Sequence, residues 1–148
     1  MLHKKLNFIF VFNRVSIIFT MDIAKIKETL NHKGYCIVPG VLNPEEVEKC
    51  IGWFREWQQS IPDHDYQHEK LSPHGIYKFH EAGHQRHAWY IRTRPKVKEV
   101  FKGLWDTNEL VVSFDGSCYI PKSLKKKDNI WTHTDQAPGK LGRHCIQG

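Results

Sequence analysis

The sequence has few cysteines and no closely spaced pair of them. Its four cysteines, Cys36, Cys50, Cys118 and Cys145, are far apart, and no two form a Cys-x-x-Cys motif. This spacing argues against a disulfide scaffold and against a zinc site built from thiolates. Reduced cysteines in a protein core explain the pattern more simply. They favour an intracellular, cytoplasmic location.

The sequence also lacks an uninterrupted hydrophobic run long enough to cross a membrane. Residues 1–20 are rich in apolar side chains, but Arg14 divides them into two short pieces and no small-residue cleavage site follows. Met21 stands directly before a well-formed helix start. We therefore expect residues 1–20 to be an upstream extension of uncertain role that the fold does not use. A secretory signal peptide is the alternative for this segment.

The central part of the chain lacks the basic excess expected of a nucleic-acid-binding protein. The 148 residues carry 22 lysines and arginines against 16 aspartates and glutamates, a formal net charge of +6. The surplus lies at the two ends, because residues 21–120 carry thirteen basic side chains against fourteen acidic ones. With 40% hydrophobic and 26% charged residues, the composition is that of one globular domain. We expect neither nucleic acid nor membrane as a partner.

Three helices have recognisable start or stop signals. Apolar residues at helical spacing predict a helix over residues 22–33, and Gly34 is its expected end. Asn43 is a capping residue, and Pro44 with two following glutamates predicts the start of a second helix. A third amphipathic helix is expected to begin at Pro95.

Most of the remaining chain is expected to be loop or strand. Residues 58–76, which hold two prolines and a glycine among polar side chains, predict a long loop. Runs of β-branched and aromatic residues predict strands at 35–38, 89–91, 110–114, 117–120, 130–132 and 145–146. The Asp115-Gly116 pair favours a tight turn between two of them. Helices first and strands later predict an α+β fold, with helices packed on a mainly antiparallel sheet.

The segment His80-Glu81-Ala82-Gly83-His84 matches the H-E-x-x-H pattern of zinc-dependent hydrolases. On a helix, this spacing places both imidazoles on one face to bind zinc, and Glu81 accepts a proton from the bound water. The context is poor, because no long amphipathic helix surrounds the segment and Gly83 lowers helix propensity. A zinc metallohydrolase is therefore kept as an alternative function. A polar surface segment is the simpler explanation.

A second motif, His133-Thr134-Asp135, follows a predicted strand. Alternate residues of an extended chain point the same way, so His133 and Asp135 can offer an imidazole nitrogen and a carboxylate oxygen to one cation. These are two of the three ligands in the 2-His-1-carboxylate triad of non-haem Fe(II). By itself the motif is unspecific, since a surface histidine near an aspartate is commonly an ion pair.

Three stretches together resemble the phytanoyl-CoA dioxygenase family. Residues 34–47, GYCIVPGVLNPEEV, are similar to the opening of that family, in which a helix and a strand precede a turn into the next helix. Residues 131–138, WTHTDQAP, resemble its iron-binding H-x-D segment, and residues 113–116 fit the strand pair before it. The order and spacing of these stretches carry the resemblance, which spans residues 22–148.

The resemblance implies a double-stranded β-helix, or jelly-roll, that binds Fe(II) and the co-substrate 2-oxoglutarate. Such an enzyme uses dioxygen to hydroxylate a small organic substrate. His133 and Asp135 correspond to iron ligands of the family. Lys78 corresponds by its order in the chain to a residue near 2-oxoglutarate, although a solvated lysine is the simpler explanation.

The sequence departs from the family pattern after Asp135. The family's second histidine and the arginine that binds 2-oxoglutarate lie on later strands, and thirteen residues follow Asp135 here. His144 is too close in sequence to lie on a separate strand of the same barrel. We therefore expect residues 21–148 to form the N-terminal portion of an incomplete jelly-roll, which needs its missing C-terminal half or a partner chain. A non-catalytic remnant is the remaining alternative.

Overall fold

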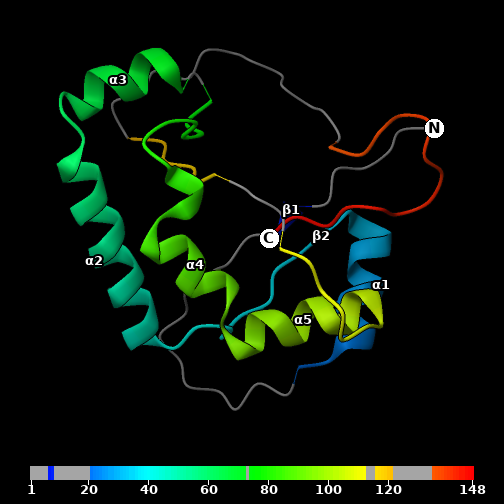
Figure 1. Ribbon diagram of the computed structural model, residues 1–148. Helices are drawn as coiled ribbons and strands as arrows, with labels where there is room; N and C mark the ends of the chain where they lie inside the picture. Colours follow the sequence, from blue (N-terminus) through cyan, green and yellow to red (C-terminus); the bar gives the residue numbers. More distant parts are fainter. Residues whose placement is uncertain (1–6, 9–20, 73, 113–115, 122–134) are drawn as a thin grey trace.

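The computed structural model describes residues 7–8, 21–72, 74–112, 116–121 and 135–148. The helices are α1 (Ile23–Lys33), α2 (Pro44–Ser60), α3 (His64–Leu71), the 3-10 helix η1 (Ala82–His84), α4 (Arg86–Arg92) and α5 (Pro95–Trp105). The strands β1 (Asn7–Phe8) and β2 (Tyr35–Cys36) pair in parallel. Figure 1 shows α2, α3 and α4 on one side of the molecule and α1 with α5 on the other.

The signals that begin and end the first two helices are confirmed. The Asp22 side chain caps α1, and Gly34 ends that helix in the left-handed conformation, with φ at 82°. At the start of α2, Asn43 and Glu46 form a reciprocal capping box. Asn43 Oδ1 accepts from the Glu46 N–H at 2.8 Å, and Glu46 Oε2 accepts from the Asn43 N–H at 2.9 Å. The helix that begins at Pro95 is also confirmed.

Removing the acceptor of this capping box should weaken α2. We expect Asn43→Ala to lower the free energy of unfolding by about 1 kcal/mol, because an N–H of the first turn loses its partner. Asn43→Asp keeps an acceptor oxygen and is the matched control, with a loss close to zero. Urea denaturation followed by circular dichroism measures both variants. An equal loss in the two would show that the cap does not act as described.

Two helices stand where the sequence predicts other structure. Helix α3 lies within residues 58–76, which are predicted as a loop, and α4 contains residues 89–91, which are predicted as a strand. Both predictions are wrong for the same reason. α3 buries His68, which is 2% exposed, and α4 buries His87, which is 5% exposed. A search for apolar periodicity counts histidine as polar and therefore misses such a helix face.

The predicted strands are found only in small part. β2 covers two residues of the predicted strand 35–38. Cys118 pairs with Ile76 in an isolated antiparallel bridge. Residues 110–112 and 145–146 are described and are not in strands, which corrects those predictions. Residues 113–115 and 130–132 lie outside the described residues. The incomplete jelly-roll therefore stays a prediction.

The buried apolar side chains form two clusters. The first lies where α1 and α5 meet the segment that follows α1, and its buried members are Ile26, Leu30, Cys36, Val38, Val41, Val97, Val100 and Leu104. The second joins the end of α2 to the segment before η1, and consists of Trp57, Ile61, Tyr77 and Ala82. α2 packs mainly on α4, while α1 packs on β2 and α5. The second cluster supports the polar site described below.

All four cysteines lie within the described residues and are free thiols. Cys36 and Cys50 are buried, as expected of core cysteines, whereas Cys118 is exposed and Cys145 is intermediate. Burial raises the pKa of the Cys36 and Cys50 thiols above 9.0, so both thiols remain protonated at neutral pH.

One short piece of the N-terminal segment contacts the rest of the fold. Asn7 pairs with Tyr35, and Phe8 pairs with Cys36. Residues 1–20 are expected to lie outside the fold, and these two positions differ from that expectation. The division of the chain at Met21 stays a prediction. None of the described helices has both the length and the apolar character that a membrane span requires.

Candidate functional site

Of the two predicted iron ligands, the structure describes Asp135, and His133 lies outside the described residues. Asp135 is exposed, and its Oδ2 accepts a hydrogen bond from Gln147 Nε2. The adjacent Gln136 holds the same stretch together, because its Oε1 accepts from the His144 N–H at 2.8 Å. Asp135 therefore presents a solvent-accessible carboxylate, oriented by an amide donor twelve residues later in the chain.

The donor chemistry of this motif fits Fe(II) in part. An imidazole nitrogen and a carboxylate oxygen are two of the ligands in the ferrous triad. Among the described residues, no three histidine, cysteine, aspartate or glutamate side chains are grouped so that they could hold a metal ion. His144 is exposed, and its Nε2 bonds to the Leu141 carbonyl at 2.8 Å. A ferrous site would thus combine Asp135 with ligands from outside the described residues.

Lys78 lies on the segment that leads from α3 to η1. Its side chain is exposed, whereas the preceding Tyr77 is buried, so Lys78 points away from the second core cluster. This environment agrees with a solvated lysine. Its contact with 2-oxoglutarate stays a prediction.

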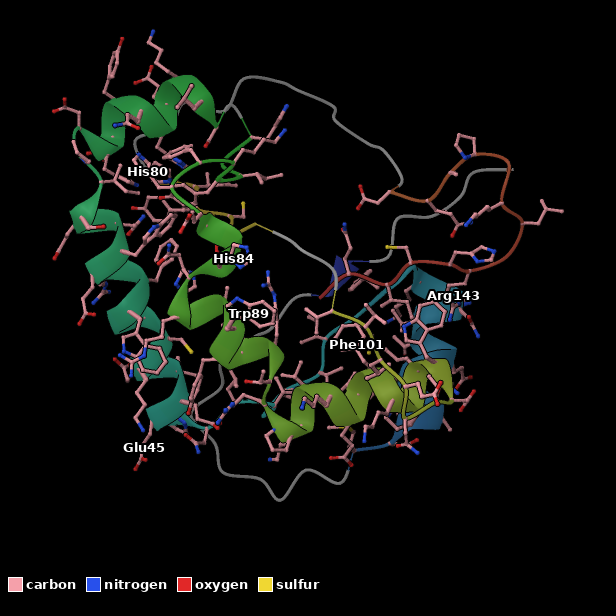
Figure 2. The ribbon with its side chains drawn as sticks, in the orientation of Figure 1. Glu45, His80, His84, Trp89, Phe101 and Arg143 are labelled. Atoms are coloured by element: carbon pink, nitrogen blue, oxygen red, sulfur yellow. The ribbon has the colours of Figure 1, made fainter. Side chains whose placement is uncertain are left out.

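The H-E-x-x-H segment does not form the helix that a zinc site requires. His80 and Glu81 have positive φ angles of 48° and 53°, and only the short η1 follows them. His80 Nε2 bonds to Gln67 Oε1 at 3.1 Å, while the His84 ring stacks on Trp89 with centroids 6.3 Å apart. Figure 2 shows His80 beside α3 and His84 at the start of α4. The helical arrangement behind the zinc alternative is therefore absent from this segment.

The structure brings together a group of polar and aromatic side chains that the sequence analysis missed. Tyr77 is 1% exposed, and its hydroxyl accepts a hydrogen bond from Gln58 Nε2 at 2.7 Å. His64 Nε2 lies 2.6 Å from the same hydroxyl, and His64 Nδ1 lies 2.8 Å from Asp65 Oδ1. In the tautomer whose Nδ1–H donates to Asp65, the His64 Nε2 accepts a hydrogen bond from the Tyr77 hydroxyl. Asp65, His64 and Tyr77 then form a continuous chain of hydrogen bonds.

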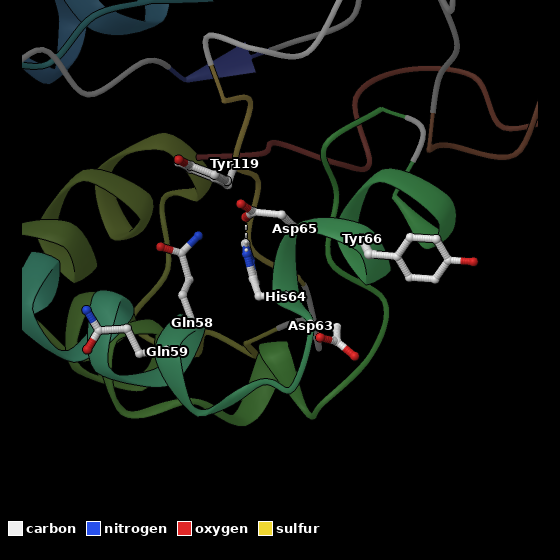
Figure 3. A pocket seen from close by; sticks show the side chains of 7 residues that line it. All are labelled: Gln58, Gln59, Asp63, His64, Asp65, Tyr66 and Tyr119. Atoms are coloured by element: carbon white, nitrogen blue, oxygen red, sulfur yellow. Dashed lines mark hydrogen bonds and ion pairs between the residues drawn. The ribbon is translucent and has the colours of Figure 1, made fainter.

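Three residues of this hydrogen-bonded group, Gln58, His64 and Asp65, line a surface pocket of about 530 Å³, shown in Figure 3. The residues that line it are Gln58, Gln59, Asp63, His64, Asp65, Tyr66 and Tyr119. Burial raises the pKa of Tyr77 above its usual value of 10.0, and the hydrogen bond from Gln58 opposes this rise only partly. A phenol with a raised pKa stays protonated at neutral pH and therefore does not act as a general base there. The chain of hydrogen bonds therefore positions Tyr77 rather than activating it.

A signal for this group was present in the sequence. His64 and His68 are four residues apart, which on a helix places them on one face. Their rings are stacked with centroids 5.5 Å apart, and the His68 ring lies 4.3 Å from that of Tyr77. The pair became recognisable only once residues 64–71 were seen to be helical.

Comparison with known proteins finds a relative in a filamentous fungus. The chain is 29% identical over 132 residues to "Ava biosynthesis cluster protein O" of Aspergillus versicolor. The match covers 82% of this chain and 43% of that protein, so the chain spans less than half of the relative's length. No protein-family model and no solved structure matches the chain. The chain is thus similar over most of its length to a protein named for a biosynthesis cluster, and its membership of the phytanoyl-CoA dioxygenase family stays a prediction.

Proposed function

We propose that this chain is part of a non-haem Fe(II)/2-oxoglutarate-dependent dioxygenase that hydroxylates a small organic substrate. The observation that carries the proposal is the H-x-D pair, His133 and Asp135, placed behind a helix, a short strand and a capped helix in the order that the resemblance requires. The structure confirms the two helices of that unit and their caps. The name of the similar protein refers to a biosynthesis cluster.

Among the described residues, Asp135 would contribute a carboxylate ligand to the iron site, and Gln147 would orient that carboxylate. Gln147 donates to one carboxylate oxygen of Asp135 and so fixes the orientation of that carboxylate, as hydrogen-bond donors beside metal ligands commonly do. His133 would supply the imidazole ligand. When bound, Fe(II) supplies the activation of dioxygen that hydroxylation needs. The third protein ligand would come from outside the described residues, and Lys78 stays the described candidate for contact with 2-oxoglutarate.

Anaerobic Fe(II) titration of the purified chain tests the proposal. We expect weak binding, because two protein ligands form a poor chelate without the third. His133→Ala and Asp135→Ala should each weaken the affinity by about 10- to 100-fold, at least the loss that removal of an outer-shell partner causes. His84→Ala is the matched control and should leave the affinity unchanged, because His84 is not part of the H-x-D motif and its ring stacks on Trp89.

The alternatives predict different patterns in the same titration. A loss of affinity in His84→Ala, with Asp135→Ala unchanged, would select the zinc alternative in spite of the geometry of residues 80–84. Weak binding that none of the three substitutions alters would contradict a ferrous site at the H-x-D motif. It would leave the chain as a non-catalytic remnant of the fold.

A further inference from the structure

Segment 116–121 lies beside helices α3 and α4, and one histidine from each helix forms a hydrogen bond with it. Ser117 O accepts from the Tyr77 N–H at 2.8 Å, and the Tyr119 N–H donates to Gly75 O at 2.8 Å. His68 Nε2 from α3 lies 2.8 Å from the Tyr119 carbonyl. Figure 1 shows this segment, in yellow-orange, beside α3 and α4. The segment is therefore joined to the helices through backbone and side-chain hydrogen bonds alike.

The second histidine that bonds to this segment is His87 on α4. Its Nε2 lies 3.0 Å from Ser117 Oγ, and its buried Nδ1 makes no hydrogen bond with any residue that the structure describes. The neutral imidazole carries one N–H. Its Nε2 can bond to Ser117, and its Nδ1 is then left as one unsatisfied ring nitrogen. The protonated ring carries two N–H groups, so Nδ1 would become a buried donor with no acceptor. These hydrogen-bond partners therefore favour the neutral form of His87 over the protonated form.

Among the described residues, the groups around His87 offer no compensating negative charge. α2 presents aromatic rings, with Phe54 edge-on at 5.1 Å and Trp57 at 5.9 Å between centroids. α4 itself contributes the Arg92 guanidinium, and segment 116–121 contributes the Ser117 hydroxyl. Burial lowers the pKa of His87 below 6.5, and the positive charge of Arg92 lowers it further.

We propose that His87 is a pH-sensitive latch: the neutral ring holds segment 116–121 against α2 and α4, and protonation of the ring releases that segment. The released state binds more protons than the docked state, because the pKa of His87 is lowered only in the docked state. Docking is therefore fully stable above the ordinary histidine pKa near 6.5, and weakens as the pH falls below it. This latch is independent of the proposed oxygenase function and needs no metal.

Hydrogen exchange on the 148-residue chain tests the latch. The amides of Tyr77 and Tyr119 report on docking, since both are bonded across the junction, and amides in the middle of α5 report on global unfolding. Protection of the two tyrosine amides should stay constant from about pH 7.5 to about pH 6.5, and below that it should fall by up to about tenfold per pH unit, the limit for one titrating group. Protection in α5 should fall less.

His87→Gln is the decisive variant, because glutamine can offer Ser117 a hydrogen bond and cannot be protonated. We expect it to remove the pH dependence of protection at Tyr77 and Tyr119. His68→Gln is the matched control: it alters the other histidine hydrogen bond, to Tyr119, and should retain the pH dependence. A pH dependence that persists in His87→Gln would overturn the proposal.

A measurement on the unaltered chain keeps the proposal testable if His87→Gln does not fold. The ring protons of His87 can be followed by nuclear magnetic resonance through the same pH range. We expect loss of protection at Tyr77 and Tyr119 to follow protonation of His87. Full protection of both amides after His87 is protonated would contradict the latch.

Discussion

Trp57→Ala should lower the free energy of unfolding by about 3–5 kcal/mol, the cost of truncating a large buried aromatic side chain. Trp57 is 8% exposed, and its ring packs against Tyr77 with centroids 4.8 Å apart. Its indole Nε1–H also donates to the His80 carbonyl at 3.1 Å. The substitution therefore empties the centre of the second core cluster and removes a hydrogen bond that ties α2 to the 77–82 segment.

Urea denaturation followed by circular dichroism measures the effect of Trp57→Ala. Since whole domains are stable by about 5–15 kcal/mol, this variant is expected to be close to unfolding. Trp57→Phe keeps most of the ring packing and loses the indole donor, so it should cost less and remain measurable. Trp89→Ala is the matched control, because Trp89 is 41% exposed on α4. Equal losses for Trp57→Ala and Trp89→Ala would refute the assignment of Trp57 to a core.

Gly75→Ala should cost about 2–4 kcal/mol, from backbone strain and steric overlap together. Gly75 has φ at 76°, a conformation that residues with a side chain rarely adopt. An added Cβ would also lie 2.7 Å from the carbonyl oxygen of Tyr119, a backbone atom that cannot move without loosening segment 116–121. The variant should thus weaken the junction between the segments 75–77 and 116–121.

Gly52→Ala is the opposing control for Gly75→Ala. Gly52 lies inside α2, and a Cβ built there meets no atom within 4 Å. Alanine at this helical position should raise the stability by about 0.5–1 kcal/mol. Thermal denaturation of the two variants should therefore shift in opposite directions. No loss of stability in Gly75→Ala would contradict the close approach of backbone at Gly75, and a loss in Gly52→Ala would contradict the open space at Gly52.

The helices with local start signals were predictable because capping is a short-range interaction. Asn43 and Glu46 satisfy each other's backbone N–H groups within a single turn, and Gly34 ends α1 through its own φ angle. Neither device depends on a distant part of the chain. Pro95 likewise marks the start of α5 without help from its neighbours.

The helices α3 and α4 were not predictable in this way, because their buried faces are made of histidine. His68 and His87 become core residues only when aromatic rings from other segments surround them. The same holds for the bridge between Cys118 and Ile76, which joins residues 42 positions apart. The H-E-x-x-H pattern failed likewise, because a pattern of residue types does not fix the backbone as helical.

The amino-acid sequence alone determined where α1, α2 and α5 begin, the near-neutral charge of residues 21–120, and the motif of imidazole and carboxylate at residues 133 and 135. Only the tertiary structure decided that residues 64–71 and 86–92 are helical and that segment 116–121 docks on them. The physical reason is the range of the interactions. Caps and charges act between near neighbours, whereas burial of a histidine against an aromatic ring exists only after distant segments have met.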